Sequence, residues 1–274
     1  MLIDTHCHLD ATEFDLDRAS VIANAVSHKV SIMVVPAVES ANFQPVINLS
    51  LKHTQIHFAL GIHPMYVDTA QPSDLILLKQ LISEQLNDPK NKLVAIGEIG
   101  LDFFVTQANR ETQEYFLSEQ LKIAQEFNLP VILHVRRAVD DVLKHLRRHA
   151  IRGGIAHAFN GSLQQALEFI KLGFKLGFGG AMTYPRALKI RELAKILPLD
   201  SIVLETDSPD IAPEWIGTKA RNEPAHLLNI AQTLADIRGL ELTQIIEITG
   251  NNASYIFPKI AALCTPLNVL HEQK

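Results

Sequence analysis

Residues Met1–Asp10 read MLIDTHCHLD, a short apolar stretch that leads directly into two histidines. Leu2–His6 has the composition of a buried β-strand. Because side chains alternate along an extended chain, His6 and His8 share one face and Cys7 points to the other. On its own, the stretch leaves two interpretations open: a metal site, or a strand that carries two imidazoles.

The same pattern, an apolar β-branched run followed by an amphipathic stretch, repeats along the chain. Such runs are typical of parallel strands covered on both faces. The expected strands are Leu2–His6, Val30–Ala37, Ile56–Ile62, Leu93–Ile99, Val131–Val135, Gly154–Ala158, Phe174–Phe178 and Ile202–Glu205. The amphipathic stretches include Asp17–His28, Pro72–Asn87, Thr112–Phe127 and Leu163–Leu172. Eight strands, each followed by a helix, predict an α/β fold of the (β/α)₈ barrel type, with an open doubly wound sheet as the alternative.

Length and composition fit one globular domain over residues 1–274. A hydrophobic fraction of 47% with 20% charged residues supports a substantial core and excludes a disordered chain. No Pro/Gly/Ser-rich linker divides the chain. After the last strand we expect helices at Thr243–Thr249 and Asn251–Phe257, stopped by Pro258.

The chain has the features of a cytoplasmic protein. Its two cysteines, Cys7 and Cys264, are far apart, which argues against a disulfide framework and suits a reducing compartment. Asp4 stands where a signal peptide would carry basic residues, and no apolar run reaches the roughly 18 residues of a membrane span. The net charge of −5 means that a polyanionic substrate would be held locally, by metal ions or a few arginines. No obligate protein partner is indicated.

Metal-competent side chains stand at the ends of several expected strands. They are His6 and His8 after the first, Glu98 at the fourth, His134 at the fifth, His157 at the sixth and Asp207 after the eighth. The C-terminal strand ends of a parallel barrel meet at one face, so these side chains should converge. A single histidine at a strand end is usually a satisfied polar residue, but convergence from five strands favours a metal site.

The types of side chain indicate the chemistry. Four imidazoles and two carboxylates suit Zn²⁺, Mn²⁺, Co²⁺ or Fe²⁺ better than Ca²⁺. The set is too large for one catalytic zinc and suits two ions bridged by a carboxylate, about 3.5–4 Å apart. Such a pair lowers the pKa of a bridging water and clamps substrate oxygens, which points to hydrolysis of a phosphoester, ester or amide.

An ordered set of motifs extends this interpretation. The chain carries, in sequence, DTHCHLD, GIHP, AIGEIGLD, LHVRRA, AHAFNGS, GFGGAMTY, LETDSPD, RNEPAHL and GNNASYIF. Together they resemble the TatD family of metal-dependent hydrolases, most closely its YjjV-type branch, up to about Phe257. The resemblance implies an amidohydrolase-type barrel, two divalent ions (Zn²⁺, Mg²⁺ or Mn²⁺) and hydrolysis of ester bonds. Several members are DNases or 3′→5′ exonucleases, and some relatives deacylate D-aminoacyl-tRNA.

The resemblance also assigns roles to the metal-competent residues. It gives the first ion to His6, His8, Glu98 and Asp207, and the second to Glu98, His134 and His157. Glu98 would bridge the ions, where many amidohydrolases have a carboxylated lysine. Asp207 is the expected general base, because a carboxylate touching both a metal and the nucleophilic water can accept the proton. Asp4 is expected to orient a ligand histidine through its other ring nitrogen.

Four further residues are candidates for substrate binding. Arg136 matches the arginine of the family's HSR-like motif, and with His63 and Arg221 it is expected to receive a phosphate. The alternative for either arginine is a surface salt bridge. Glu205 shares a face with Asp207 and is expected either to orient water or substrate, or to form a buried salt bridge.

Other segments are given structural interpretations. The pair Phe103–Phe104 is expected to pack in the core, with base stacking as the alternative. The basic stretch Lys144–Arg152 is expected to be a solvated helix face, and Asn222 in the RNEP turn a structural residue.

Three hypotheses about function follow. The first is a metal-dependent phosphodiesterase that acts on DNA, which would be its partner at the metal site. The second is a metal-dependent deacylase of the D-aminoacyl-tRNA type, or hydrolysis of another ester or amide. The third is a binding protein that uses its metals structurally.

Overall fold

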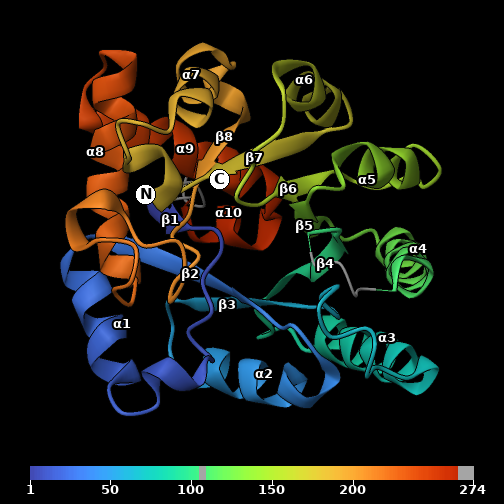
Figure 1. Ribbon diagram of the computed structural model, residues 1–274. Helices are drawn as coiled ribbons and strands as arrows, with labels where there is room; N and C mark the ends of the chain where they lie inside the picture. Colours follow the sequence, from blue (N-terminus) through green and yellow to red (C-terminus); the bar gives the residue numbers. More distant parts are fainter. Residues whose placement is uncertain (105–108, 265–274) are drawn as a thin grey trace, which may run out of the picture.

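The computed structural model describes residues 1–104 and 109–264, which contain one sheet of eight parallel strands. The strands follow one another in the order of the sequence, and the sheet curls into a barrel surrounded by helices (Figure 1). Their bounds are β1 Leu2–Asp4, β2 Val30–Pro36, β3 Ile56–Leu60, β4 Leu93–Asp102, β5 Val131–Arg136, β6 Gly154–Ala156, β7 Phe174–Phe178 and β8 Ile202–Leu204. The predicted (β/α)₈ barrel is confirmed. Residues 265–274 of the predicted domain lie outside the described residues.

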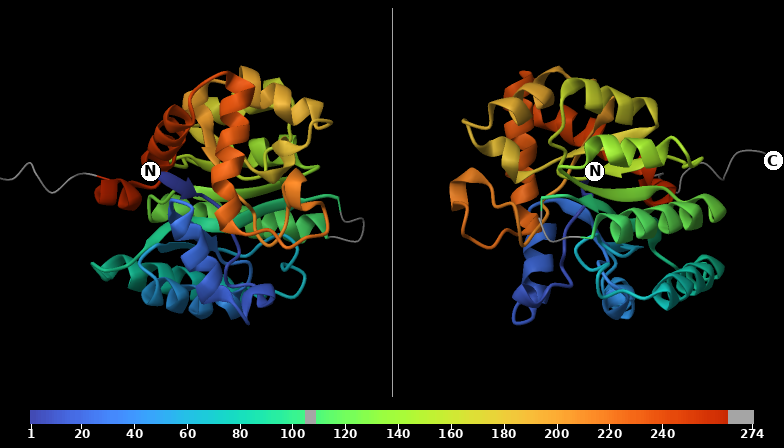
Figure 2. Two further views of the ribbon diagram at one scale, coloured as in Figure 1. Left: turned by 90° about the vertical axis from the view of Figure 1, so that its left-hand side faces the viewer. Right: turned by 45° about the vertical axis from the view of Figure 1, so that its right-hand side comes forward.

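Helices alternate with the strands and cover the outside of the barrel, as both views in Figure 2 show. They are α1 Arg18–Ser27, α2 Phe43–Lys52, α3 Pro72–Asn87, α4 Arg110–Glu126, α5 Val139–Leu146, α6 Leu163–Lys171, α7 Leu188–Ile196, α8 Leu227–Arg238, α9 Leu242–Ile256 and α10 Pro258–Cys264. The helices expected from amphipathic patterns are all present, with ends shifted by a residue or two. No helix within the described ranges has the length and apolar character to cross a bilayer.

The buried hydrophobic residues form two clusters, one outside the barrel and one inside it. The outer cluster lies between the strands and the surrounding helices. The inner cluster consists of Ile3, Ile32, Val34, Ala59, Val94, Ala95, Ile132, Ile155 and Val203 from the strands, with Ala253, Ile256, Phe257 and Ile260 from the C-terminal segment. The last helices therefore close one end of the barrel, and the active-site loops have the other end to themselves.

The C-terminal segment differs from the prediction. α9 is a continuous helix across the two expected pieces, Thr243–Thr249 and Asn251–Phe257. α9 ends at Ile256, just ahead of Pro258 as predicted, and Pro258 then begins a further helix, α10. The first position of a helix tolerates proline, because the N–H that proline lacks would have no intrahelical partner there. Gly250 of α9 packs so closely under Met1 that a Cβ would collide with the Met1 carbonyl oxygen.

The barrel closes between β1 and β8 without a regular ladder. In the described part of the chain these two strands share no strand pairing. Instead, the backbone N–H and the hydroxyl of Thr5 donate to the Leu204 carbonyl, at 3.1 and 3.0 Å. In return, the backbone N–H and the hydroxyl of Thr206 donate to the Asp4 carboxylate, at 3.0 and 2.6 Å. This junction, called the seam below, depends on side chains where the other strand pairs have ladders.

Candidate metal centre

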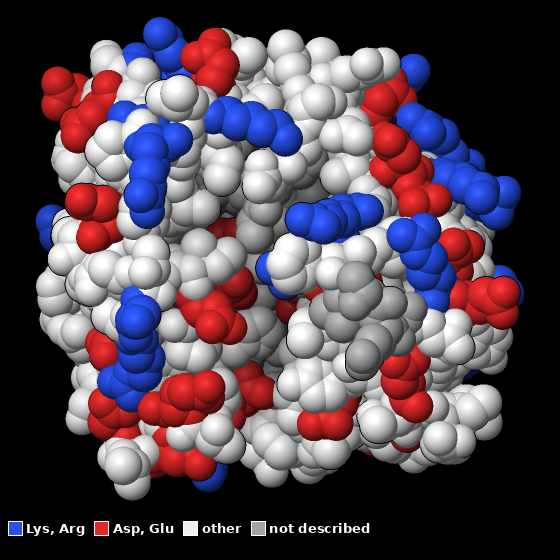
Figure 3. Space-filling view, in the orientation of Figure 1, with Lys and Arg blue, Asp and Glu red and all other residues white. Residues whose placement is uncertain are grey.

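The six predicted ligands converge at the C-terminal end of the barrel. His6, Glu98 and His157 are buried, and His8, His134 and Asp207 are partly buried. Figure 3 shows this end as a hollow with Asp and Glu side chains inside it. Cys7 belongs to the outer hydrophobic cluster, in keeping with its predicted orientation away from the histidines.

Glu98 lies inside β4 rather than at its end, because β4 is longer than expected. The pairing register of β4 with β5 shifts between Ile96 and Ile99, so Glu98 sits in a bulge. A bulge bends the strand and re-aims a side chain. Gly100, opposite His134, has no room for a Cβ, which would collide with the His134 carbonyl oxygen. The close approach of β4 and β5 thus brings the two side chains together.

The two carboxylate oxygens of Glu98 face different histidines. Oε2 is 3.3 Å from His6 Nε2 and 3.5 Å from His8 Nε2. The nitrogens nearest Oε1 are His134 Nδ1 at 3.0 Å, His157 Nε2 at 3.3 Å and His63 Nε2 at 3.4 Å. The imidazoles nearest the two oxygens are therefore different, and His6 of one group stacks on His157 of the other, with ring centroids 3.9 Å apart.

These separations fit shared metal ligands. Two ligand atoms bound to one ion at about 2.0–2.1 Å, with angles between about 90° and 120°, lie about 2.8–3.6 Å apart. Asp207 Oδ1 completes the first group, 3.5 Å from His6 Nε2 and 3.7 Å from His8 Nε2. The sets that could hold an ion are His6–Glu98–His157, His6–His8–Asp207 and His63–Glu98–His134. The donor set therefore fits a divalent metal. His63, predicted as a substrate contact, lies within this cluster.

The electrostatics of the cluster favour a cation at its centre. Burial opposes ionisation of Glu98, but the surrounding histidines, His63 first among them, hold the pKa of this carboxyl well below its ordinary value. Burial also disfavours protonation of His157, yet Asp207 and Glu98 outweigh it and raise its pKa to about 10. Burial raises the pKa of Asp207 to about 6, with His157 acting in the opposite direction. A divalent ion would displace these imidazole protons.

Asp102 is a site residue that the sequence analysis missed. It is buried, and its Oδ2 lies 3.0 Å from His134 Nε2. The other ring nitrogen of His134 faces Glu98, so the imidazole is held between two carboxylates. Such a partner fixes the orientation and tautomer of a ligand histidine. The signal was present in GEIGLD, where the even spacing places Asp102 on the same strand face as Glu98.

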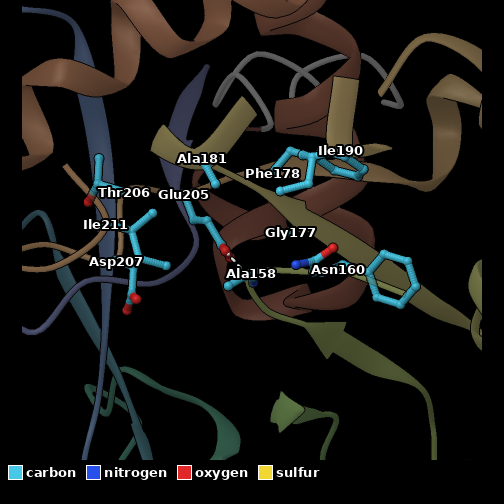
Figure 4. A pocket seen from close by; sticks show the side chains of 12 residues that line it. Ala158, Asn160, Gly177, Phe178, Ala181, Ile190, Glu205, Thr206, Asp207 and Ile211 are labelled. Carbon is cyan, nitrogen blue, oxygen red and sulfur yellow. Dashed lines mark hydrogen bonds between the residues drawn. The ribbon is translucent and has the colours of Figure 1, made fainter. Parts of the chain in front are cut away.

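Glu205 lies behind His157. Its Oε1 accepts the Ala158 N–H at 2.5 Å (Figure 4). The same oxygen lies 3.4 Å from His157 Nδ1. Gly177 packs against the carboxylate, and a Cβ there would collide with it. This is the buried ion pair that the sequence left open as one alternative, and it directs Nε2 of His157 toward Glu98.

The expected role of Asp4 is wrong. Nδ1 of His6 has no hydrogen-bond partner among the described residues. The Asp4 carboxylate accepts the backbone N–H of His6 at 3.3 Å and turns across the seam to Thr206. Asp4 therefore joins β1 to the segment after β8 instead of orienting an imidazole.

The two candidate arginines lie in different surroundings. The Arg221 guanidinium binds both carboxylate oxygens of Asp17, at 2.9 and 2.6 Å, and Glu223 at 2.8 Å. These ion pairs lie apart from the histidine cluster and correspond to the salt-bridge alternative. Arg136 has a half-exposed side chain, and its Nη1 lies 4.0 Å from Asp102 Oδ2.

The phenylalanine pair divides between the two interpretations. Phe103 packs against the outer cluster, as expected. The expectation of core packing is wrong for Phe104, which is 44% exposed. Its backbone N–H donates to Asp102 Oδ1 at 2.9 Å, which turns the ring outward at the edge of the site.

Several residues that shape the site have left-handed backbone conformations. Asp207 has φ 56° and Ala158, which follows His157, has φ 43°. Such conformations cost non-glycine residues of order 1–3 kcal/mol and cluster at functional sites. The buried Asn222 supports the Asp207 turn, since its Nδ2 donates to the carbonyls of Thr206 and Asp210 at 2.8 and 2.9 Å. This agrees with its predicted structural role.

A small cavity of about 140 Å³ adjoins Asp207. Its lining is largely apolar, and Figure 4 shows the labelled side chains around it. The apolar lining residues include Phe159, Phe178, Ala181, Ile190 and Ile211, and the polar ones are Asn160, Glu205, Thr206 and Asp207. The site therefore combines a charged cluster with a small apolar recess.

The fold and the site together define a class of protein. A closed parallel barrel with a histidine–carboxylate cluster at the C-terminal strand ends is the architecture of barrel hydrolases that use metals. The family model described as "TatD related DNase" matches residues 3–258. The chain belongs to the TatD family, as its motifs predicted.

Individual relatives agree. The "Uncharacterized metal-dependent hydrolase YjjV" of Escherichia coli is 39% identical over 256 residues, 93% of this chain and 97% of the relative. The crystal structure of YjjV has a TM-score of 0.89 and covers 94% of this chain and 98% of its own. Human "Deoxyribonuclease TATDN3" is 33% identical over 269 residues, 96% of each chain. An amidohydrolase from Saccharomyces cerevisiae, at 20% identity over 93% of this chain and 99% of its own, shares the fold with a TM-score of 0.81. The chain is therefore a metal-dependent hydrolase of the TatD family.

Proposed function

We propose that this hydrolase is a phosphodiesterase that cleaves DNA with a binuclear metal centre. One observation carries the proposal: the two oxygens of Glu98 face separate groups of imidazoles, as a bridging carboxylate requires. The sequence predicted two ions from the number of ligands and from the family resemblance, which also divided the ligands between them; the positions of the two Glu98 oxygens support that division.

The division assigns residues to each ion. The first would be held by His6, His8, Asp207 and Oε2 of Glu98, and the second by Oε1 of Glu98, His134 and His157. His63, 3.4 Å from the same oxygen, is a further nitrogen on the second side. When bound, two such ions lower the pKa of a water molecule and neutralise charge on the phosphate oxygens.

Asp207 is proposed as the general base. Its carboxylate lies beside the first group, with Oδ1 3.5 Å from His6 Nε2. A carboxylate that touches both a metal ion and the nucleophilic water can orient that water and accept its proton. The turn held by Asn222 fixes the carboxylate in place for this transfer.

The substrate assignment rests on relatives and on charge. The family description and the human relative are named for deoxyribonuclease activity. Arg136, half exposed at the edge of the hollow, is proposed to bind a phosphate oxygen. Glu205 is proposed to position His157 rather than to touch the substrate, and Arg221 to bind Asp17 in the substrate complex as well.

The test combines metal analysis with a substrate panel. Protein stripped with a chelator and reloaded with Mg²⁺, Mn²⁺ or Zn²⁺ should bind about two ions per chain and release nucleotides from DNA. Asp207→Asn should lower kcat by about 10²–10⁴-fold because it removes the proton acceptor. The matched control is Asp210→Asn, an exposed carboxylate three residues away, which should keep wild-type turnover.

The panel separates the other hypotheses. Hydrolysis of D-aminoacyl-tRNA without release of nucleotides from DNA would replace the phosphodiesterase proposal by the deacylase. Wild-type biological function in Asp207→Asn, with metals still bound, would mean that the ions are structural.

A further inference from the structure

An exposed aromatic ring and two arginines form a surface patch at the edge of the metal centre. The guanidinium carbon of Arg136 lies 3.7 Å from the centroid of the Phe104 ring, and that of Arg137 lies 4.6 Å from it. Both arginines are exposed, as is the ring. These three residues are called the Phe104 platform.

The platform is joined directly to the candidate metal ligands. Asp102 accepts the backbone N–H of Phe104 with one oxygen and faces His134 Nε2 with the other. The strand register places Arg136 opposite Asp102, two residues beyond His134 on β5. One buried carboxylate therefore separates the platform from the second group of ligands, so a molecule on the platform lies next to the reacting centre.

The positive charge of the platform is free for a ligand. Arg136 has one ion-pair contact, with Asp102 at 4.0 Å, the outer limit of such a contact. Arg137 forms no ion pair with any residue of the ranges 1–104 and 109–264, and its left-handed backbone, φ 54°, turns the chain there. Figure 3 shows Lys and Arg side chains bordering the hollow on the side of β5 and α5, with carboxylates inside it.

We infer that the Phe104 platform binds the nucleotide next to the scissile phosphate of a single-stranded polynucleotide. Guanidinium groups pair with the adjacent phosphate, while an unpaired base stacks on the ring or on a guanidinium plane. Within a duplex, both faces of every interior base are covered by its stacked neighbours, so the platform favours single strands. This inference rests on the proposed phosphodiesterase activity and adds a subsite to it.

The experiment compares a polymer with a small phosphodiester. Substrates are a single-stranded oligothymidylate and methyl 4-nitrophenyl phosphate, which is too small to reach from the metals to the platform. Phe104→Leu keeps the apolar bulk but loses the aromatic face, and should raise KM for the oligonucleotide at least about five-fold with kcat unchanged. Phe104→Tyr, which keeps the aromatic face, should have the wild-type KM. Wild type and both variants should hydrolyse the small ester with the same kcat and KM.

Arg137→Ala supplies an independent measurement. Removal of one phosphate contact should reduce the slope of log affinity against log salt by about 0.7 for a single strand. The matched control is Arg148→Ala, an exposed arginine just beyond the end of α5. Because α5 runs back along the barrel, this arginine lies at the opposite end, and its removal should leave the slope unchanged.

Binding measured separately from cleavage keeps the two proposals apart. Fluorescence anisotropy with a hydrolysis-resistant phosphorothioate oligonucleotide reports the platform in the metal-loaded protein. Unchanged binding and KM in Phe104→Leu and Arg137→Ala would overturn the platform and leave the phosphodiesterase standing. Platform-dependent binding without nucleotide release by wild type would overturn the phosphodiesterase instead. An equal rise of KM for blunt duplex DNA in Phe104→Leu would overturn the selection of single strands.

Discussion

Asp102 shows how much of this site depends on a side chain outside the predicted ligand set. It holds His134 from the side opposite Glu98 and also anchors Phe104. An asparagine at position 102 would keep the size and shape of the side chain. It would lose the negative charge that favours a protonated, hydrogen-bond-donating Nε2 on His134.

Asp102→Asn should therefore weaken metal binding or turnover by about 10–100-fold, the usual cost of losing the carboxylate behind a ligand histidine. The measurement is a competition titration with a chelator, together with steady-state kinetics. Asp68→Asn, an exposed carboxylate on the loop after β3, is the control. Wild-type metal affinity and turnover in Asp102→Asn would show that His134 is oriented by Glu98 and its backbone alone.

The sequence was informative about residues whose positions follow from strand ends. His134, His157 and Asp207 lie where a parallel barrel brings its C-terminal strand ends together. The role expected for Asp4 is wrong, because its partner across the seam, Thr206, is 202 residues away along the chain. Pairings between such distant side chains depend on the closed barrel, which no local pattern encodes. The assignment of the converging residues as ligands stays a prediction.

At the scale of elements, β4 determines the shape of the site. Its bulge at Glu98 and its glycines allow β5 to approach closely. The expected strand, Leu93–Ile99, ends one residue before the glycine at position 100. In the structure this glycine continues the strand, since it is the residue that fits against the His134 backbone.

Gly100→Ala should destabilise the protein by about 1–3 kcal/mol, the range for overpacking in a well-packed interior. The added methyl group must push the β5 backbone, and with it His134, away from Glu98. Thermal unfolding measures the effect on stability, and metal titration measures the displacement. Gly239→Ala is the control, because φ is 64° there but no atom lies within 4 Å of the added Cβ. If Gly100→Ala lost no more stability than Gly239→Ala, the close-approach argument would be refuted.

At the scale of the whole molecule, the proposed first ion would lie across the seam. His6 and His8 follow β1 and Asp207 follows β8, and these strands lack a ladder in the described part of the chain. An ion shared by these ligands would link the first and last strands of the barrel. Metal affinity and barrel closure should therefore be coupled.

Removal of metal should lower the unfolding temperature and expose the seam to solvent exchange. At a free metal concentration a hundred times the dissociation constant, metal binding adds about 2.7 kcal/mol to the free energy of unfolding. Hydrogen exchange should report faster exchange at the amides of Thr5 and Thr206 in the chelated protein. The amide of Leu133, within the β4–β5 ladder, is the internal control. Equal protection of the seam with and without metal would place the ion elsewhere.

The packing of Gly250 under Met1 has a practical meaning for handling the protein. The N-terminus lies beside α10, on the closed end of the barrel, as the left view of Figure 2 shows. The hollow with its candidate metal ligands opens at the other end. A fusion partner or a surface linker attached ahead of Met1 would hold the barrel by its base, with its mouth facing the solution. Immobilised in that orientation, the enzyme would keep the entrance to the hollow open to solution.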